Sequence, residues 1–65
     1  MRSFTPLVTE QLLTSEQVAG QLQVPVETLR KWRYHRSGPT FLKIGRHVRY
    51  KQIDVDRFVA RSKVA

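Results

Sequence analysis

The segment Arg36-Ser37-Gly38-Pro39 divides this 65-residue chain into two parts with different hydrophobic periodicity. Glycine followed by proline ends a helix, because glycine takes the left-handed conformation at the terminus and proline cannot continue the hydrogen bonding. Before this break the apolar residues recur at helical spacing, and after it they alternate with polar residues, as in a β-strand. We therefore expect helices before the break and a strand pair directly after it.

The first helix is predicted from its N-terminal signals. Thr14 and Gln17 have the spacing of a capping box, and Leu13 and Val18 have that of a hydrophobic staple. The apolar stripe that follows is short, so this helix is expected to end near residues 21–22.

The second helix begins only a few residues later. Pro25 suits its first turn, where the missing N–H is harmless, and Glu27 suits the positive end of the helix dipole. Leu29 and Trp32 are three residues apart and are expected to face inward, so we assign Trp32 to the core and not to base stacking. Gly38 is expected to supply the left-handed residue that ends this helix.

Residues 41–51 predict a β-hairpin. Leu42 and Ile44 alternate with a lysine, Val48 and Tyr50 alternate with basic residues, and Gly45-Arg46-His47 separates the two runs. This alternation predicts one apolar face and one basic face. Acidic residues early and basic residues late then predict a third helix over residues 52–61.

The expected fold class is α+β, mostly helical, in the order helix, helix, two-stranded hairpin, helix. We expect residues 1–11 to be a flexible arm, residues 12–61 to form the domain, and residues 62–65 to be a tail. A domain of this size must hold together on a small core, since it has no cysteine for disulfides.

The basic charge is concentrated in the middle of the chain. Twelve Lys and Arg against five acids give a net charge of +7. Between Thr28 and Ile53 there is no acidic residue, and the basic residues there are Arg30, Lys31, Arg33, Arg36, Lys43, Arg46, Arg49 and Lys51. Such a field attracts polyanions, which favours nucleic acid first and an anionic membrane surface second.

Several other classes are disfavoured. His35 and His47 lack a second ligand at metal spacing, and no catalytic triad, carboxylate pair or phosphate loop is present. We therefore expect no metal, no cofactor and no enzymatic activity. The chain shows neither a signal peptide nor an apolar run of membrane length, which predicts a cytosolic protein without membrane association.

Two short helices joined by a tight turn predict a helix-turn-helix, whose second helix fits the major groove of B-DNA. A basic hairpin directly after that helix has the character of a wing, and arginine is favoured in narrow minor grooves. For the major groove the predicted contacts are Glu27, Thr28, Arg30, Lys31 and Tyr34. For the wing they are Lys43, Arg46, His47 and Arg49, and for phosphates Arg33, Arg36 and Lys51. Glu27 is either a base contact or a dipole residue, and Tyr34 either a contact or a surface tyrosine.

The run LLTSEQVAGQLQVPVETLRKWRYHRSGPTFLKIGRHVRYKQIDVDRFV, residues 12–59, resembles the MerR-like winged helix-turn-helix of excisionases from phages and mobile elements. The resemblance rests on L-T-x-x-x-V-A-x-x-L, on the run Glu27 to Trp32, on Gly45-Arg46 and on Asp54-Val55. Gln23 departs from the usual Gly or Asn of the turn, and Pro25 from the usual Ser or Thr cap.

The resemblance implies a recombination directionality factor. Such a protein binds and bends attachment-site DNA, directs an integrase toward excision, and assembles cooperatively on DNA. Because the sequence has no dimerisation helix, we expect a monomer when it is free of DNA. A small transcriptional regulator with the same fold is the alternative. An RNA-binding protein and a module that binds an acidic protein are further alternatives.

Overall fold

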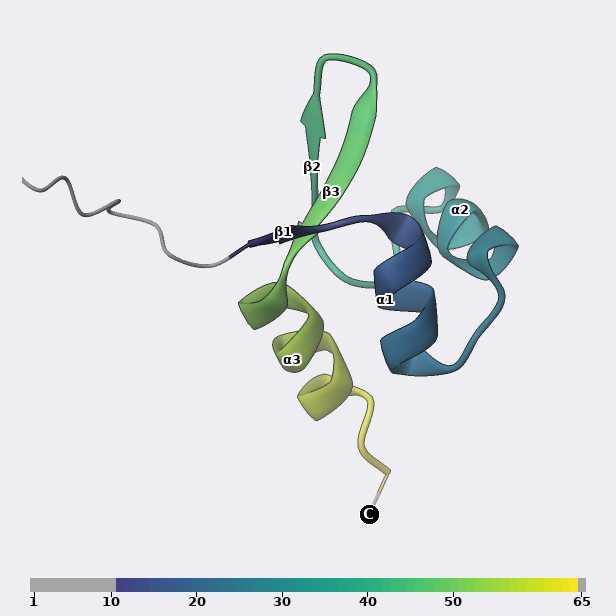
Figure 1. Cartoon of the computed structure of the whole chain (residues 1–65). Coiled ribbons are helices and arrows are strands. Elements are labelled where there is room, and N and C mark those ends of the chain that lie inside the picture. The colour runs from purple at the N-terminus through teal and green to yellow at the C-terminus, as the bar shows by residue number, and fades with distance from the viewer. Residues whose placement is uncertain (1–10, 65) are drawn as a thin grey trace, which may run out of the picture.

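The computed structural model describes residues 11–64 and shows three helices around one face of a small antiparallel sheet (Figure 1). In chain order the elements are β1 (Leu12–Leu13), α1 (Ser15–Leu22), α2 (Val26–Tyr34), β2 (Phe41–Ile44), β3 (His47–Lys51) and α3 (Gln52–Arg61). The predicted α+β winged helix-turn-helix fold is confirmed. Except for Gln11, the predicted N-terminal arm lies outside the described residues.

The start of α1 confirms the predicted capping box. The Thr14 hydroxyl accepts a hydrogen bond from the Gln17 backbone N–H at 3.1 Å, and the Gln17 side-chain oxygen accepts one from the Thr14 N–H at 2.9 Å. Leu13 packs against the core that contains Val18, as the staple requires. Two otherwise unpaired donors of the first turn are thereby satisfied.

Gln23, which departs from the usual Gly or Asn, ends α1 in the left-handed conformation with φ 57°. Its N–H donates to the Gly20 carbonyl, and the N–H of Val24 donates to the Ala19 carbonyl at 3.0 Å. These two backbone hydrogen bonds form a Schellman motif. The turn to α2 therefore has the backbone that glycine normally provides, formed here by a glutamine.

The residue that ends α2 is Arg36 and not the expected Gly38. Arg36 has φ 56°, and the Ser37 N–H donates to the Trp32 carbonyl at 2.7 Å in a second Schellman pattern. Gly38 also has a positive φ, 82°, but it serves the turn beyond the helix. Pro25 precedes the first helical residue as the N-cap, so its carbonyl accepts from Thr28 N–H at 2.9 Å.

The sheet has a third strand that the sequence did not indicate. β1 pairs antiparallel with β3, with Leu12 opposite Lys51 and Leu13 opposite Tyr50, which gives the strand order β1-β3-β2. Two residues are too few for an alternating pattern to be visible. Their pairing makes β3 the central strand of the sheet.

The hairpin forms as predicted, but its two faces are mixed. Phe41 lies opposite Tyr50, Leu42 opposite Arg49, Lys43 opposite Val48, and Ile44 opposite His47. Residues opposite each other share a face, so Leu42 and Ile44 lie on the face away from Tyr50 and Val48. The prediction that the hairpin has a single apolar face is therefore wrong.

The cause is the length of the turn. The sequence suggested a three-residue separator, Gly45-Arg46-His47, which would place Ile44 opposite Val48. In the structure His47 belongs to β3, so only Gly45 and Arg46 form the turn. Gly45 has φ 61°, which fits the first central position of a type II′ turn. A shift of one residue moves a strand's side chains to the other face.

Five residues form the buried core, and they come from all three helices and from β3. These are Val18, Ala19, Leu29, Tyr50 and Val55. Trp32 packs against this core, as predicted, with its ring 5.2 Å from that of Phe58 on α3. Gln21 of α1 and Gln52 at the start of α3 exchange two side-chain hydrogen bonds of 2.8 Å. α3 is thus fixed to both other helices.

Candidate nucleic-acid interface

The outer face of α2 gathers four of the five predicted major-groove residues. Glu27, Arg30, Lys31 and Tyr34 are exposed and line one shallow hollow, while Leu29 anchors the opposite side of the helix in the core. Tyr34 is 83% exposed, so it contributes little to packing. The structure places the fifth residue, Thr28, half-buried and outside this hollow.

Glu27 and Arg30 form an ion pair of 3.4 Å on this face. Their side chains are 68% and 67% exposed, and ion pairs at such exposure contribute at most about 1 kcal/mol. The pair therefore opens at low cost. Either side chain is then available to a base edge, since carboxylates accept from cytosine and arginine donates to guanine.

The predicted wing residues do not form one surface. Arg46 is exposed in the two-residue turn at the tip of the hairpin. Lys43 shares the face of Tyr50, which is directed toward the helices, whereas His47 and Arg49 lie on the far face. Lys51, a predicted phosphate contact, also lies on the far face with its partner Leu12. Of the predicted contact residues on the strands, only Lys43 therefore lies on the face that is directed toward the helices.

Arg33, predicted as a phosphate contact, is held in place by residues distant in sequence. Its Nη1 donates to the Tyr50 hydroxyl at 2.8 Å and to Ser15 Oγ at 3.2 Å. The guanidinium also lies 5.9 Å from the centre of the Phe41 ring. These contacts connect α2 to the start of α1 and to both strands of the hairpin.

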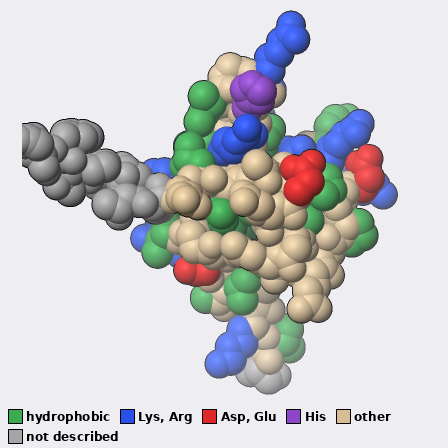
Figure 2. Space-filling model, in the orientation of Figure 1, with side chains coloured by type: hydrophobic (Ala, Val, Ile, Leu, Met, Phe, Trp, Pro, Cys, Tyr) green, Lys and Arg blue, Asp and Glu red, His purple; other side chains and the backbone are tan. Residues whose placement is uncertain are grey.

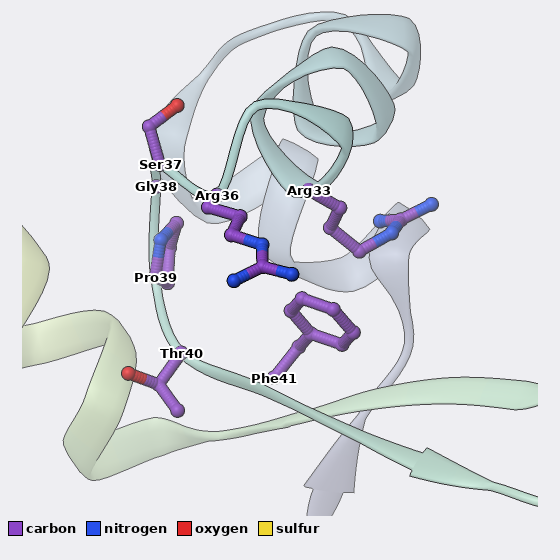
Figure 3. Close-up of a pocket in the computed structure, with 7 residues that line it drawn as sticks. All are labelled: Arg33, Arg36, Ser37, Gly38, Pro39, Thr40 and Phe41. Carbon is purple, nitrogen blue, oxygen red and sulfur yellow. The ribbon is translucent and has the colours of Figure 1, made fainter.

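Arg36, the other predicted phosphate contact near the end of α2, is exposed and lines a pocket of about 370 Å³. Figure 3 shows the Arg36 side chain reaching from the end of α2 toward the Phe41 ring, while the Arg33 side chain passes that ring and its guanidinium turns away from Arg36. The loop residues 37–40 complete the wall. Sequence reasoning did not bring these side chains together, because the contacts span the turn between α2 and β2.

The surface charge agrees with the sequence. Figure 2 shows basic side chains projecting from the tip of the hairpin and from the region of α2. Within residues 11–64 no group of three or more His, Cys, Asp or Glu side chains is arranged to hold a metal ion. None of the helices in that range is long and apolar enough to cross a membrane.

An anchored first helix, a second helix exposed along one face and a hairpin beside it define the winged helix-turn-helix class of DNA-binding folds. A family model described as a helix-turn-helix domain matches residues 12–63. The chain belongs to this helix-turn-helix family, which includes excisionase-like DNA-binding proteins. Membership supports sequence-specific DNA binding by this chain. No curated protein and no solved structure matches the chain.

Proposed function

We propose that the chain binds duplex DNA through two adjacent grooves. The observation that carries this proposal is the exposed face of α2, with Glu27, Arg30, Lys31 and Tyr34 around one hollow beside a hairpin with Arg46 at its tip. The helix enters the major groove, whose base edges these side chain types can read. Arg46 enters the neighbouring minor groove, where narrow A·T-rich DNA concentrates negative potential.

The biological role that we propose is that of an excisionase, a recombination directionality factor. Its support is the resemblance of residues 12–59 to excisionases, together with the family match. In this role the protein bends attachment-site DNA, assembles cooperatively along it and directs an integrase toward excision. Bending a site of 20–30 base pairs by 40–90° costs about 1–6 kcal/mol, which contacts in two grooves offset.

The role is tested by an excision assay with attachment-site DNA and an integrase encoded beside this gene. We expect excision to depend on the protein and the shifted DNA to migrate as a bent complex. Specific DNA binding without any effect on excision would indicate a transcriptional regulator instead. Tighter binding to structured RNA than to duplex DNA at the same salt would reject DNA as the ligand.

The two-groove arrangement is tested by Arg46→Ala. The side chain is exposed in the turn, so the fold should be unchanged. Affinity should fall, and the preference for A·T pairs at one flank of the selected site should weaken, while the preference read by α2 is kept. Arg57→Ala removes an equal charge from an exposed position on α3 and serves as the control. Identical selected sites for wild type and Arg46→Ala would refute minor-groove insertion.

A further inference from the structure

The pocket between the last turn of α2 and β2 contains two arginines that the protein does not neutralise. In the described range the one ion pair within 4.0 Å is that of Glu27 and Arg30, so neither Arg33 nor Arg36 has a carboxylate partner. Arg33 is nevertheless half-buried and oriented by two neutral hydroxyls. A cation held in place without a counterion favours binding of an anion from outside.

Arg36 adds a second observation, which concerns the backbone. It takes the left-handed conformation, φ 56°, at a position where glycine would be unstrained. Its guanidinium lines the pocket near the Phe41 ring (Figure 3). The helix-end hydrogen bonds account for this backbone, as they do at Gln23, but they do not require an arginine there, and contact with a ligand gives the side chain a role.

We infer that this pocket is a binding site for one phosphate of the DNA backbone, which Arg33 and Arg36 contact. The inference rests on the proposed two-groove binding. When a helix occupies the major groove and a wing the next minor groove, the sugar-phosphate strand between those grooves passes between helix and wing. The pocket lies there, since its walls are the end of α2, residues 37–40 and Phe41. A planar guanidinium group can donate two parallel hydrogen bonds to the oxygens of one phosphate.

The roles of the two arginines differ. Arg33 uses Nη1 for Ser15 and Tyr50, which leaves its other donors for a phosphate oxygen. Ser15 is the first residue of α1, so Arg33 also lies near the positive end of that helix dipole. Tyr50 is 1% exposed and cannot touch DNA, so its hydroxyl acts only by positioning Arg33. Arg36, whose side chain makes no hydrogen bond or ion pair within residues 11–64, supplies the second guanidinium.

Arg36→Gly separates stability from binding. Removal of the left-handed strain should raise Tm by about 4–8 °C, because the strain is on the order of the free energy that produces such a shift. Loss of the phosphate contact should weaken DNA binding about tenfold and reduce the salt slope by about 0.9. The matched control is Gln23→Gly, which relieves the same conformation at the end of α1 without removing a charge. Its Tm should rise as well, with DNA affinity unchanged.

Tyr50→Phe tests the positioning of Arg33 without removing any charge. The ring that fills the core is kept, and the hydroxyl 2.8 Å from Arg33 is lost. DNA affinity should fall although the altered atom is buried. In the double variant with Arg33→Lys, the two losses should be less than additive, since both remove the same contact. Additive losses would show that Tyr50 does not act through Arg33.

The phosphate itself is identified by replacing single DNA phosphates with uncharged methylphosphonates along the bound site. One position between the two contacted grooves should weaken wild-type binding about tenfold and weaken Arg36→Gly binding less, because only Arg33 meets that phosphate in the variant. If wild type binds the DNA site but no position shows this coupling, the inferred phosphate-binding site is wrong while the proposed function stands. If wild type does not bind duplex DNA, the proposed function itself fails. A Tm increase in inorganic phosphate over chloride at equal ionic strength, without coupling to any DNA position, would assign the pocket to the free anion and overturn the inference.

Discussion

Replacing Gly38 by alanine tests whether the turn after α2 depends on close contact with Trp32. A Cβ atom at this position would lie 2.8 Å from Trp32 Cβ and 2.9 Å from Cε3, and the backbone has φ 82°. The left-handed conformation costs a non-glycine residue about 1–2 kcal/mol. Crowding against a packed side chain adds about 1–3 kcal/mol. The sum, about 2–5 kcal/mol, is comparable to the whole stability of a domain this small, about 3–5 kcal/mol.

Thermal melting of three variants separates the two contributions. Gly45 also has a positive φ, but an added Cβ there meets nothing within 4 Å, so Gly45→Ala should show the backbone cost alone. Gly20→Ala, in the interior of α1, should instead stabilise by about 1 kcal/mol. Gly38→Ala should be largely unfolded at temperatures where Gly45→Ala is still native. Equal melting temperatures for these two variants would refute the steric part of the reasoning.

Three further predictions concern the interface and the core. If about four to six basic residues meet phosphates, log K for DNA should fall with log salt at a slope of roughly −4 to −5, and a slope near zero would contradict electrostatic binding. Arg30→Ala and Lys31→Ala should melt like wild type and lose about 1–3 kcal/mol of discrimination between specific and random duplexes; equal losses for both duplexes would make these side chains phosphate contacts. Trp32→Ala should cost about 3–5 kcal/mol in free energy of unfolding, because its ring packs on Phe58, and a variant with normal Tm but lost binding would make Trp32 a contact residue.

The parts of the fold that depend on neighbours in sequence were predictable. The capping box of Thr14 and Gln17 involves residues three apart, and the inward positions Leu29 and Trp32 follow from helical spacing. The left-handed residues were harder to predict from the sequence, because Gln and Arg are not the residue types expected at the positions of Gln23 and Arg36. Hydrogen bonding at the helix ends determined the conformation there, in spite of the residue type.

In the hairpin the strands were predicted correctly, but the residues on each face were not. Alternation located both strands, but the faces depend on whether the turn has two or three residues. With two, Leu42 and Ile44 lie on the same face as Arg49. Arg33 shows a second limit: its partners Ser15 and Tyr50 are 18 and 17 residues away, and no local pattern predicts such contacts. The candidate site on α2 was therefore predictable, and its supporting contacts were not.

The scarcity of ion pairs in the described structure has a consequence for the free protein. The chain carries a net charge of +7, and its basic residues repel one another when no polyanion is bound. Added salt screens that repulsion and should make the free protein more resistant to unfolding, while it weakens the attraction to DNA. Folding and binding thus respond to ionic strength in opposite directions. The salt concentration that best preserves the folded chain is not the one at which it holds DNA most tightly.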